Sequence, residues 1–141
     1  MASAAEIIRS MLVDLGLGTD PSSQGLWPIF VSNEPNRPDN CITIYDTASS
    51  DDGRSMVDGE LFSHEGLQVR VRSVDYPTGY TKANSIRTAL AKSINFRTTY
   101  IDSQGYLVYC CSKIGNVLPI GTEQTSKRQL FTLNCLVSMD N

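Results

Sequence analysis

The sequence predicts an α+β fold in which a largely antiparallel sheet carries two helices packed on one face. Two segments, 2–17 and 80–94, repeat apolar residues at helical spacing. Strand-like segments follow one another in groups instead of alternating with helices, which is typical of antiparallel sheets. The chain has 141 residues and no repeat, low-complexity segment or linker. We therefore expect a single domain over residues 1–141.

The first helix is expected over 2–17. Ser3 is a plausible N-cap, with Glu6 as its capping-box partner, and Gly16 and Gly18 end the helix. The apolar stripe of this helix consists of Ala4, Ile8, Met11, Leu12 and Leu15. After a turn-rich segment, 27–32 and 41–45 are expected as strands, separated by a proline-containing loop at 33–40.

The central part of the chain combines an acidic segment with the longest strand candidate. Segment 46–59 is expected to form an extended acidic loop, because it has little apolar content and its charges are Asp46, Asp51, Asp52 and Asp58 against Arg54. Segment 60–74 alternates with period two. Its apolar face holds Leu67, Val69 and Val71, and its polar, basic face holds Gln68, Arg70 and Arg72.

The second half begins with a turn at 75–79, followed by the second helix from Tyr80, which Thr78 or Thr81 could cap. Segments 95–102 and 106–113 are expected to form a β-hairpin around Ser103-Gln104-Gly105. Segment 115–121 is short and extended. Segment 129–139 has no wholly polar face, so we expect a central strand covered on both sides.

Composition excludes several function classes. Twelve Lys and Arg against 15 Asp and Glu give a net charge of −3, which excludes a protein that grips nucleic acid through a strongly basic surface. Charged residues make up only 19 %, so part of the surface is expected to be buried against copies of the chain or a partner. The sequence contains no run of about 18 apolar residues, so it predicts no membrane span.

The sequence also lacks the patterns of common catalytic and metal sites. The one histidine, His64, lies next to Glu65 in a strand, where neighbouring side chains point to opposite faces. The four cysteines form no CxxC pair, so we expect reduced thiols, with a Cys41–Cys135 disulfide left open. No phosphate-binding, dinucleotide-binding or hydrolase motif occurs. We therefore expect no enzyme activity, no cofactor and no metal.

The segment from Gly66 to Leu90 carries a resemblance. Gly66-Leu67-Gln68-Val69-Arg70-Val71-Arg72-Ser73 leads into Asp75-Tyr76, then into Gly79-Tyr80-Thr81-Lys82-Ala83 and the second helix. This pattern resembles the core of tail terminators and minor capsid proteins of long-tailed bacteriophages, which also open with an amphipathic helix. The resemblance extends in element order over roughly 1–139. The shared pattern is one of packing and contains no catalytic signature.

The resemblance implies a structural virion protein. Such subunits form a ring, usually a hexamer, on the last layer of the tail tube. The ring stops tube polymerisation and offers a surface to the neck or stopper protein, and double-stranded DNA passes through it. The chain would then belong to the tail or neck of a virion assembled in the bacterial cytoplasm, with no membrane contact.

Candidate contacts with a neighbouring subunit or the tail tube follow from charge and position. They are the loop residues Asp46, Asp51, Asp52, Arg54 and Asp58, the strand residues Gln68, Arg70 and Arg72, and the helix residues Lys82 and Arg87. Acidic groups of the loop could pair with the basic groups of the strand and helix. Two alternatives remain open at this point: another neck protein, such as a stopper or connector, and a stand-alone small-ligand or peptide-binding α+β domain.

Overall fold

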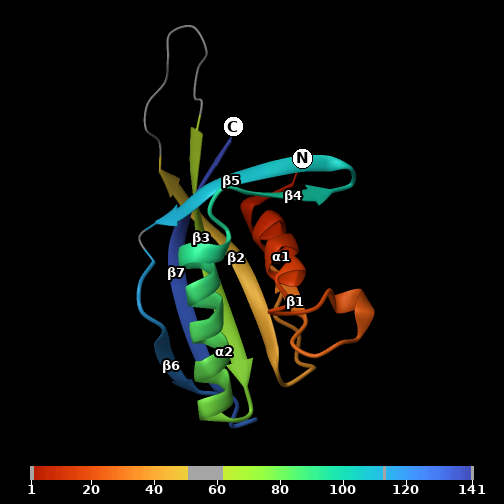
Figure 1. Ribbon diagram of the computed structural model, residues 1–141. Helices are drawn as coiled ribbons and strands as arrows, with labels where there is room; N and C mark the ends of the chain where they lie inside the picture. Colours follow the sequence, from red (N-terminus) through yellow and green to blue (C-terminus); the bar gives the residue numbers. More distant parts are fainter. Residues whose placement is uncertain (1, 51–61, 113, 141) are drawn as a thin grey trace, which may run out of the picture.

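A computed structural model describes residues 2–50, 62–112 and 114–140. Its elements follow the order α1 (Ala4–Asp14), a 3-10 turn (Pro21–Ser23), β1 (Ile29–Val31), β2 (Cys41–Ser50), β3 (Phe62–Ser73), α2 (Tyr76–Thr88), a π-helical turn (Ala89–Ser93), β4 (Arg97–Ile101), β5 (Gln104–Ser112), β6 (Leu118–Thr122) and β7 (Gln129–Asp140). Figure 1 shows both helices on the same side of the sheet. The predicted α+β class is confirmed.

The sheet has seven strands in the order β1-β2-β3-β7-β5-β4, and β6 also pairs with β7. Every pair is antiparallel except β1 with β2. β7 pairs with β3 along its whole length and with β5 and β6 on its other side, so its expected central position is confirmed. The expected cover on both faces is present only in part, because Asn134 is exposed.

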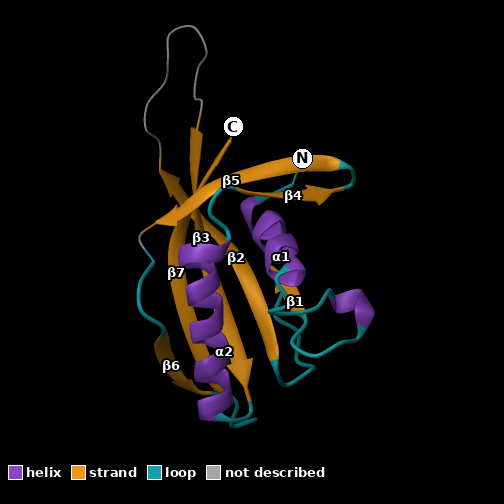
Figure 2. Ribbon diagram, in the orientation of Figure 1, coloured by secondary structure: helices purple, strands orange, loops and turns teal. Residues whose placement is uncertain are grey.

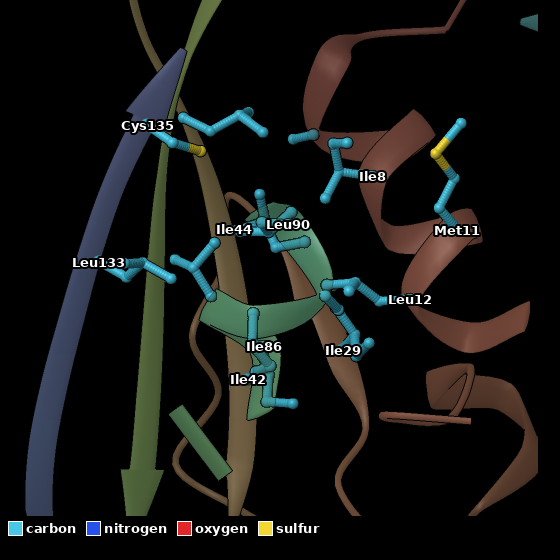
Figure 3. Close-up of a cluster of buried hydrophobic side chains, with 14 of the residues drawn as sticks. Ile8, Met11, Leu12, Ile29, Ile42, Ile44, Ile86, Leu90, Leu133 and Cys135 are labelled. Carbon is cyan, nitrogen blue, oxygen red and sulfur yellow. The ribbon is translucent and has the colours of Figure 1, made fainter. Parts of the chain in front are cut away.

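The core lies between the helices and one face of the sheet. Leu67, Val69 and Val71 of β3 are at most 2 % exposed. They oppose Cys135, Leu133 and Phe131 of β7. Figure 3 shows Ile8 and Leu12 of α1 and Ile86 of α2 on the helix side of these strands, while Met11, which also belongs to the core, lies on the far side of α1. The alternation of β3 and the stripe of α1 therefore bury the faces that the sequence predicts.

Helix α1 begins as expected and ends earlier. Ser3 is its N-cap and accepts a hydrogen bond from the Glu6 amide at 3.3 Å, while the Ser3 hydroxyl lies 3.4 Å from the Glu6 carboxylate. The last helical residue is Asp14, and Leu15 forms the C-cap. Gly16 then adopts a left-handed conformation with φ 77°, which glycine accommodates at low cost.

Helix α2 begins four residues before the expected start. Its N-cap is Asp75, whose carboxylate accepts hydrogen bonds from the Thr78 amide at 3.4 Å and the Thr78 hydroxyl at 2.7 Å. The prediction of a turn over 75–79 was wrong because Pro77 lies in the first turn of the helix, where no backbone N–H is needed. Tyr76 then stacks on Tyr80 and contacts Phe131 of β7.

The β4–β5 hairpin is confirmed, but its turn is Asp102-Ser103, where both residues have positive φ. The expected turn at Ser103-Gln104-Gly105 was misplaced, because Gln104 and Gly105 already pair with β4. Figure 2 shows this hairpin extending across the end of α1 as an arm. One face of the arm packs on α1, because Thr99 hydrogen-bonds with Ser10 at 2.7 Å and the Tyr106 hydroxyl accepts from the Ala2 amide at 3.0 Å. Among the described residues, no helix is long and apolar enough to cross a membrane.

Candidate functional site

The first residues of the acidic loop expected at 46–59 belong to a strand. Residues 46–50 extend β2 and pair with β3, with a register shift between Thr47 and Ser50. The expectation was wrong there because cross-strand pairing, rather than local alternation, extends the strand. Asp51, Asp52, Arg54 and Asp58 lie outside the described residues.

Asp46 contributes to the internal structure of the protein. Its carboxylate accepts a hydrogen bond from the Ala5 amide at 3.1 Å, at the N-terminus of α1. A negative charge at this position compensates the positive end of the helix dipole. Asp46 therefore joins β2 to α1, although its side chain is exposed to solvent.

The basic face of β3 lies on the side of the sheet away from the helices, where the loop over 32–40 partly covers it. Arg72 is 3 % exposed and donates to the Asp39 carbonyl at 3.2 Å and the Pro38 carbonyl at 2.7 Å. Arg70 forms an ion pair with Glu34 at 3.2 Å. Arg72 is thus unavailable to a neighbour, while contacts of Gln68 and Arg70 with another subunit remain a prediction.

Arg128, which the sequence analysis did not single out, is the centre of this polar network. It is 5 % exposed and donates to the Asn36 carbonyl at 2.6 Å, to Asp39 at 3.2 Å and to Glu123 at 2.8 Å. Its partner Asn36 is 92 positions away. The hydrogen bond from Ser126 and then that from Arg128 hold the pKa of Glu123 below its ordinary value. The network fixes the loop over 32–40 to the β6–β7 turn.

The two candidate residues of the second helix, Lys82 and Arg87, also have partners within the chain. Lys82 donates to the Leu17 carbonyl at 2.8 Å, and its ammonium group lies 5.3 Å from the centre of the Trp27 ring. Burial lowers the pKa of Lys82. Arg87 donates to the Gly115 carbonyl at 3.0 Å. Lys82 and Arg87 have different partners from Arg70 and Arg72. The structure therefore does not bring the candidate residues together in one site.

The chemistry-bearing residues form no catalytic arrangement in the described ranges. His64 hydrogen-bonds to Ser138 through Nδ1 at 2.8 Å across the β3–β7 pair. All four cysteines are free, so the disulfide that the sequence left open is not formed. Within 2–50, 62–112 and 114–140, no group of three or more potential ligands could hold a metal ion.

An open cleft of about 880 Å³ lies between the start of α1, β2, the start of β3, the end of β7 and the arm. Glu6, Asp46 and Glu65 contribute its carboxylates. Thr98, Leu107 and Met139 contribute to its less polar wall. Sequence reasoning did not find this cleft, because its walls come from α1, β2, β3, the arm and β7, which only the tertiary structure brings together.

Comparison with known proteins supports the resemblance. The family described as bacteriophage tail terminator protein matches residues 11–112. No curated protein matches the chain. One similar solved structure, whose name describes no activity, covers 99 % of this chain and 98 % of its own, with a TM-score of 0.53 and 14 % identity. That likeness concerns the fold alone. Since the family matches well over half of the sequence, the chain belongs to the bacteriophage tail terminator proteins, which are structural components of phage tails.

Proposed function

We propose that this chain forms a closed ring on the head-proximal end of a phage tail tube. The observation that carries the proposal is the family match over residues 11–112, together with the α+β fold. Six copies are expected. The ring ends polymerisation of the tube protein and offers its other side to the neck or stopper protein.

The function is geometric. In a cyclic ring, each subunit contacts its neighbour through two different patches, and the ring closes when the rotation between copies closes. One side of the ring then fits the last layer of the tube, while the other side differs from a tube layer and stops further addition. Polymerisation ends without a chemical step.

DNA passes through the ring without being held. Arg70 and Arg72 both lie near Glu34, at 3.2 and 3.9 Å, so this carboxylate offsets part of the positive charge of the strand face. Arg72 is also only 3 % exposed. A net charge of −3 adds a weak repulsion of the phosphate backbone. A ring whose channel is lined by Arg70 and Arg72 would contradict this part of the proposal.

A polymerisation assay tests the proposed function. The purified tube protein is allowed to assemble with increasing amounts of this chain, and tube lengths are measured by electron microscopy. We expect tubes to become shorter as the chain is added, with the chain at one end only. Tubes of unchanged length, with the chain absent from their ends, would contradict the proposal and favour a neck stopper or connector.

A further inference from the structure

The two ends of the β2–β3–β7 sheet carry opposite charge. At one end is the cleft described above, which we call the acidic cleft and define by Glu6, Asp46 and Glu65. No cationic side chain is among the described residues that line it. Glu6 and Asp46 each take part in holding the start of α1, whereas Glu65 lies half-buried on β3.

The acidic cleft adjoins an uncharged face of the arm. Alternation in the hairpin places Thr98, Tyr100, Leu107 and Tyr109 on the face opposite to the one that packs on α1. Tyr100 is 70 % exposed. Phe96, at the base of the arm, is 75 % exposed and holds a positive φ of 53° while its ring packs edge-on against Tyr109. Exposed aromatic side chains are enriched in protein–protein interfaces.

At the other end of the sheet, the polar network forms what we call the basic corner. Its cations are Arg37, Arg70, Arg72, Lys127 and Arg128, and its carboxylates are Glu34, Asp39 and Glu123. Five cations against three carboxylates leave a surplus of two positive charges. Arg72 and Arg128 are only 3 % and 5 % exposed, so the exposed cations of this corner are Arg37 and Lys127. Asp75 lies on the helix side of this end, where it caps α2.

The basic corner also has exposed apolar groups beside it. Its turn joins β6 to β7, and Leu118 and Ile120 of β6 are 53 % and 49 % exposed. Lys127 is exposed on this turn, and the Arg37 side chain is 77 % exposed. Figure 1 shows β6 and the arm at opposite ends of the molecule. Each end therefore combines uncharged, partly apolar surface with charge of one sign.

A single chain cannot bring these two ends together. Glu65 lies near the start of β3 and Arg72 near its end, so seven strand residues separate the two by about 23 Å. Opposite charge on two different patches is what a head-to-tail contact between identical subunits requires. We propose that the acidic cleft and arm of one copy receive the basic corner and β6 of the next copy. This inference rests on the ring put forward under the proposed function.

Charge reversal tests this contact. Glu65→Lys changes the cleft at a residue that caps no helix, and Lys127→Glu changes an exposed residue of the corner. Association of the purified full chain is measured by sedimentation at several salt concentrations, with circular dichroism to check the fold. We expect each reversal to weaken association roughly tenfold, and the double variant to lose less than the sum of the two effects, because both act on the same contact.

Two matched controls carry the same charge changes elsewhere. Asp20→Lys changes an exposed residue in the segment before β1, and Lys92→Glu changes an exposed residue after α2. Both should associate as the unmodified chain does. Association of the unmodified chain should weaken as salt rises, and this dependence should be smaller in the two reversal variants.

Several results would overturn the proposed contact. These are an unmodified chain that stays monomeric at every salt concentration, reversal variants that associate normally, and additive effects in the double variant. If Glu65→Lys instead abolished only binding to the tube protein, the acidic cleft would belong to that partner. If both reversal variants still form rings and still cap tubes, the proposed contact is wrong but the proposed function is not affected.

Discussion

Individual side chains in this protein bind residues that are far away in the sequence. Arg128 is the clearest case, because its guanidinium joins the loop over 32–40 to the β6–β7 turn through three polar partners. Removing one partner of a buried polar network leaves the others without compensation. The stability of this end of the sheet therefore depends strongly on a residue that has no distinctive sequence context.

We predict that Arg128→Ala lowers the free energy of unfolding by roughly 2–3 kcal/mol, because it leaves Asn36, Asp39 and Glu123 without their shared donor. Urea unfolding followed by circular dichroism measures the change. Lys127→Gln, at the exposed neighbouring position, is the matched control and should stay within about 0.5 kcal/mol. Equal stability of the two variants would show that the network contributes little.

A pH dependence follows from Glu123. Its pKa is lower in the folded protein than the ordinary value of 4.5, first because of Ser126 and then because of Arg128. A lowered carboxyl pKa contributes stability that is fully present above the unfolded value and is lost as pH falls through the folded value. The unmodified protein should therefore lose stability as the pH falls from about 6 to about 3, and Glu123→Gln should lose less over the same range. An unchanged pH profile in the variant would contradict this assignment.

These polar networks could not be predicted from the sequence, whereas the buried face of β3 could. The alternation of Leu67, Val69 and Val71 identifies the buried face of β3 locally, and the structure confirms it. The same alternation assigns Arg72 to an open basic face, yet the loop over 32–40 covers this side chain. Nothing near Arg72 in the sequence signals that cover, because it depends on contacts with residues more than thirty positions away.

At the scale of elements, helix α2 shows how close packing overrides helix propensity. Gly79 lies in its first turns, against the sheet. A Cβ added there would lie 2.5 Å from the Phe131 ring and 2.8 Å from Cβ of Ser73. The absence of a side chain therefore allows α2 to approach β7 closely, where Tyr76 and Tyr80 also contact Phe131.

We predict that Gly79→Ala destabilises the protein by about 1–3 kcal/mol, although alanine is the better helix former by about 1 kcal/mol. The steric clash with the buried Phe131 ring outweighs the gain in propensity. Thermal unfolding of the variant measures the effect. Ser85→Ala, at an exposed position of the same helix, should be neutral or slightly stabilising. Stabilisation by Gly79→Ala would show that the helix can move away from β7.

The elements themselves were predictable to different degrees. α1, the β4–β5 hairpin and the central position of β7 follow from periodicity and turn residues, which act locally. The start of α2 was mispredicted because 75–79 was expected to form a turn, whereas Asp75 and Pro77 together begin the helix. The extension of β2 through residues 46–50 depends on pairing with β3, which no local pattern in that polar segment indicates.

At the scale of the whole molecule, the acidic composition has an uneven distribution. The cleft at the arm end holds three carboxylates, and the corner at the opposite end holds a surplus of cations. The net charge of −3 is therefore the sum over two ends of opposite charge. The sequence alone could not locate these ends, because their residues come from segments spread over the whole chain. Such a distribution suits a subunit that meets copies of itself head to tail.

Electron microscopy of the purified virion tests the central claim most directly, with three-dimensional reconstruction of the junction between tail and head. We expect one closed ring of this chain on the head-proximal layer of the tail tube, with DNA passing through its centre. The family assignment alone requires only a tail component. A virion in which this chain is distributed along the tube, or is absent from the head-proximal junction, would show that it does not form the terminal ring.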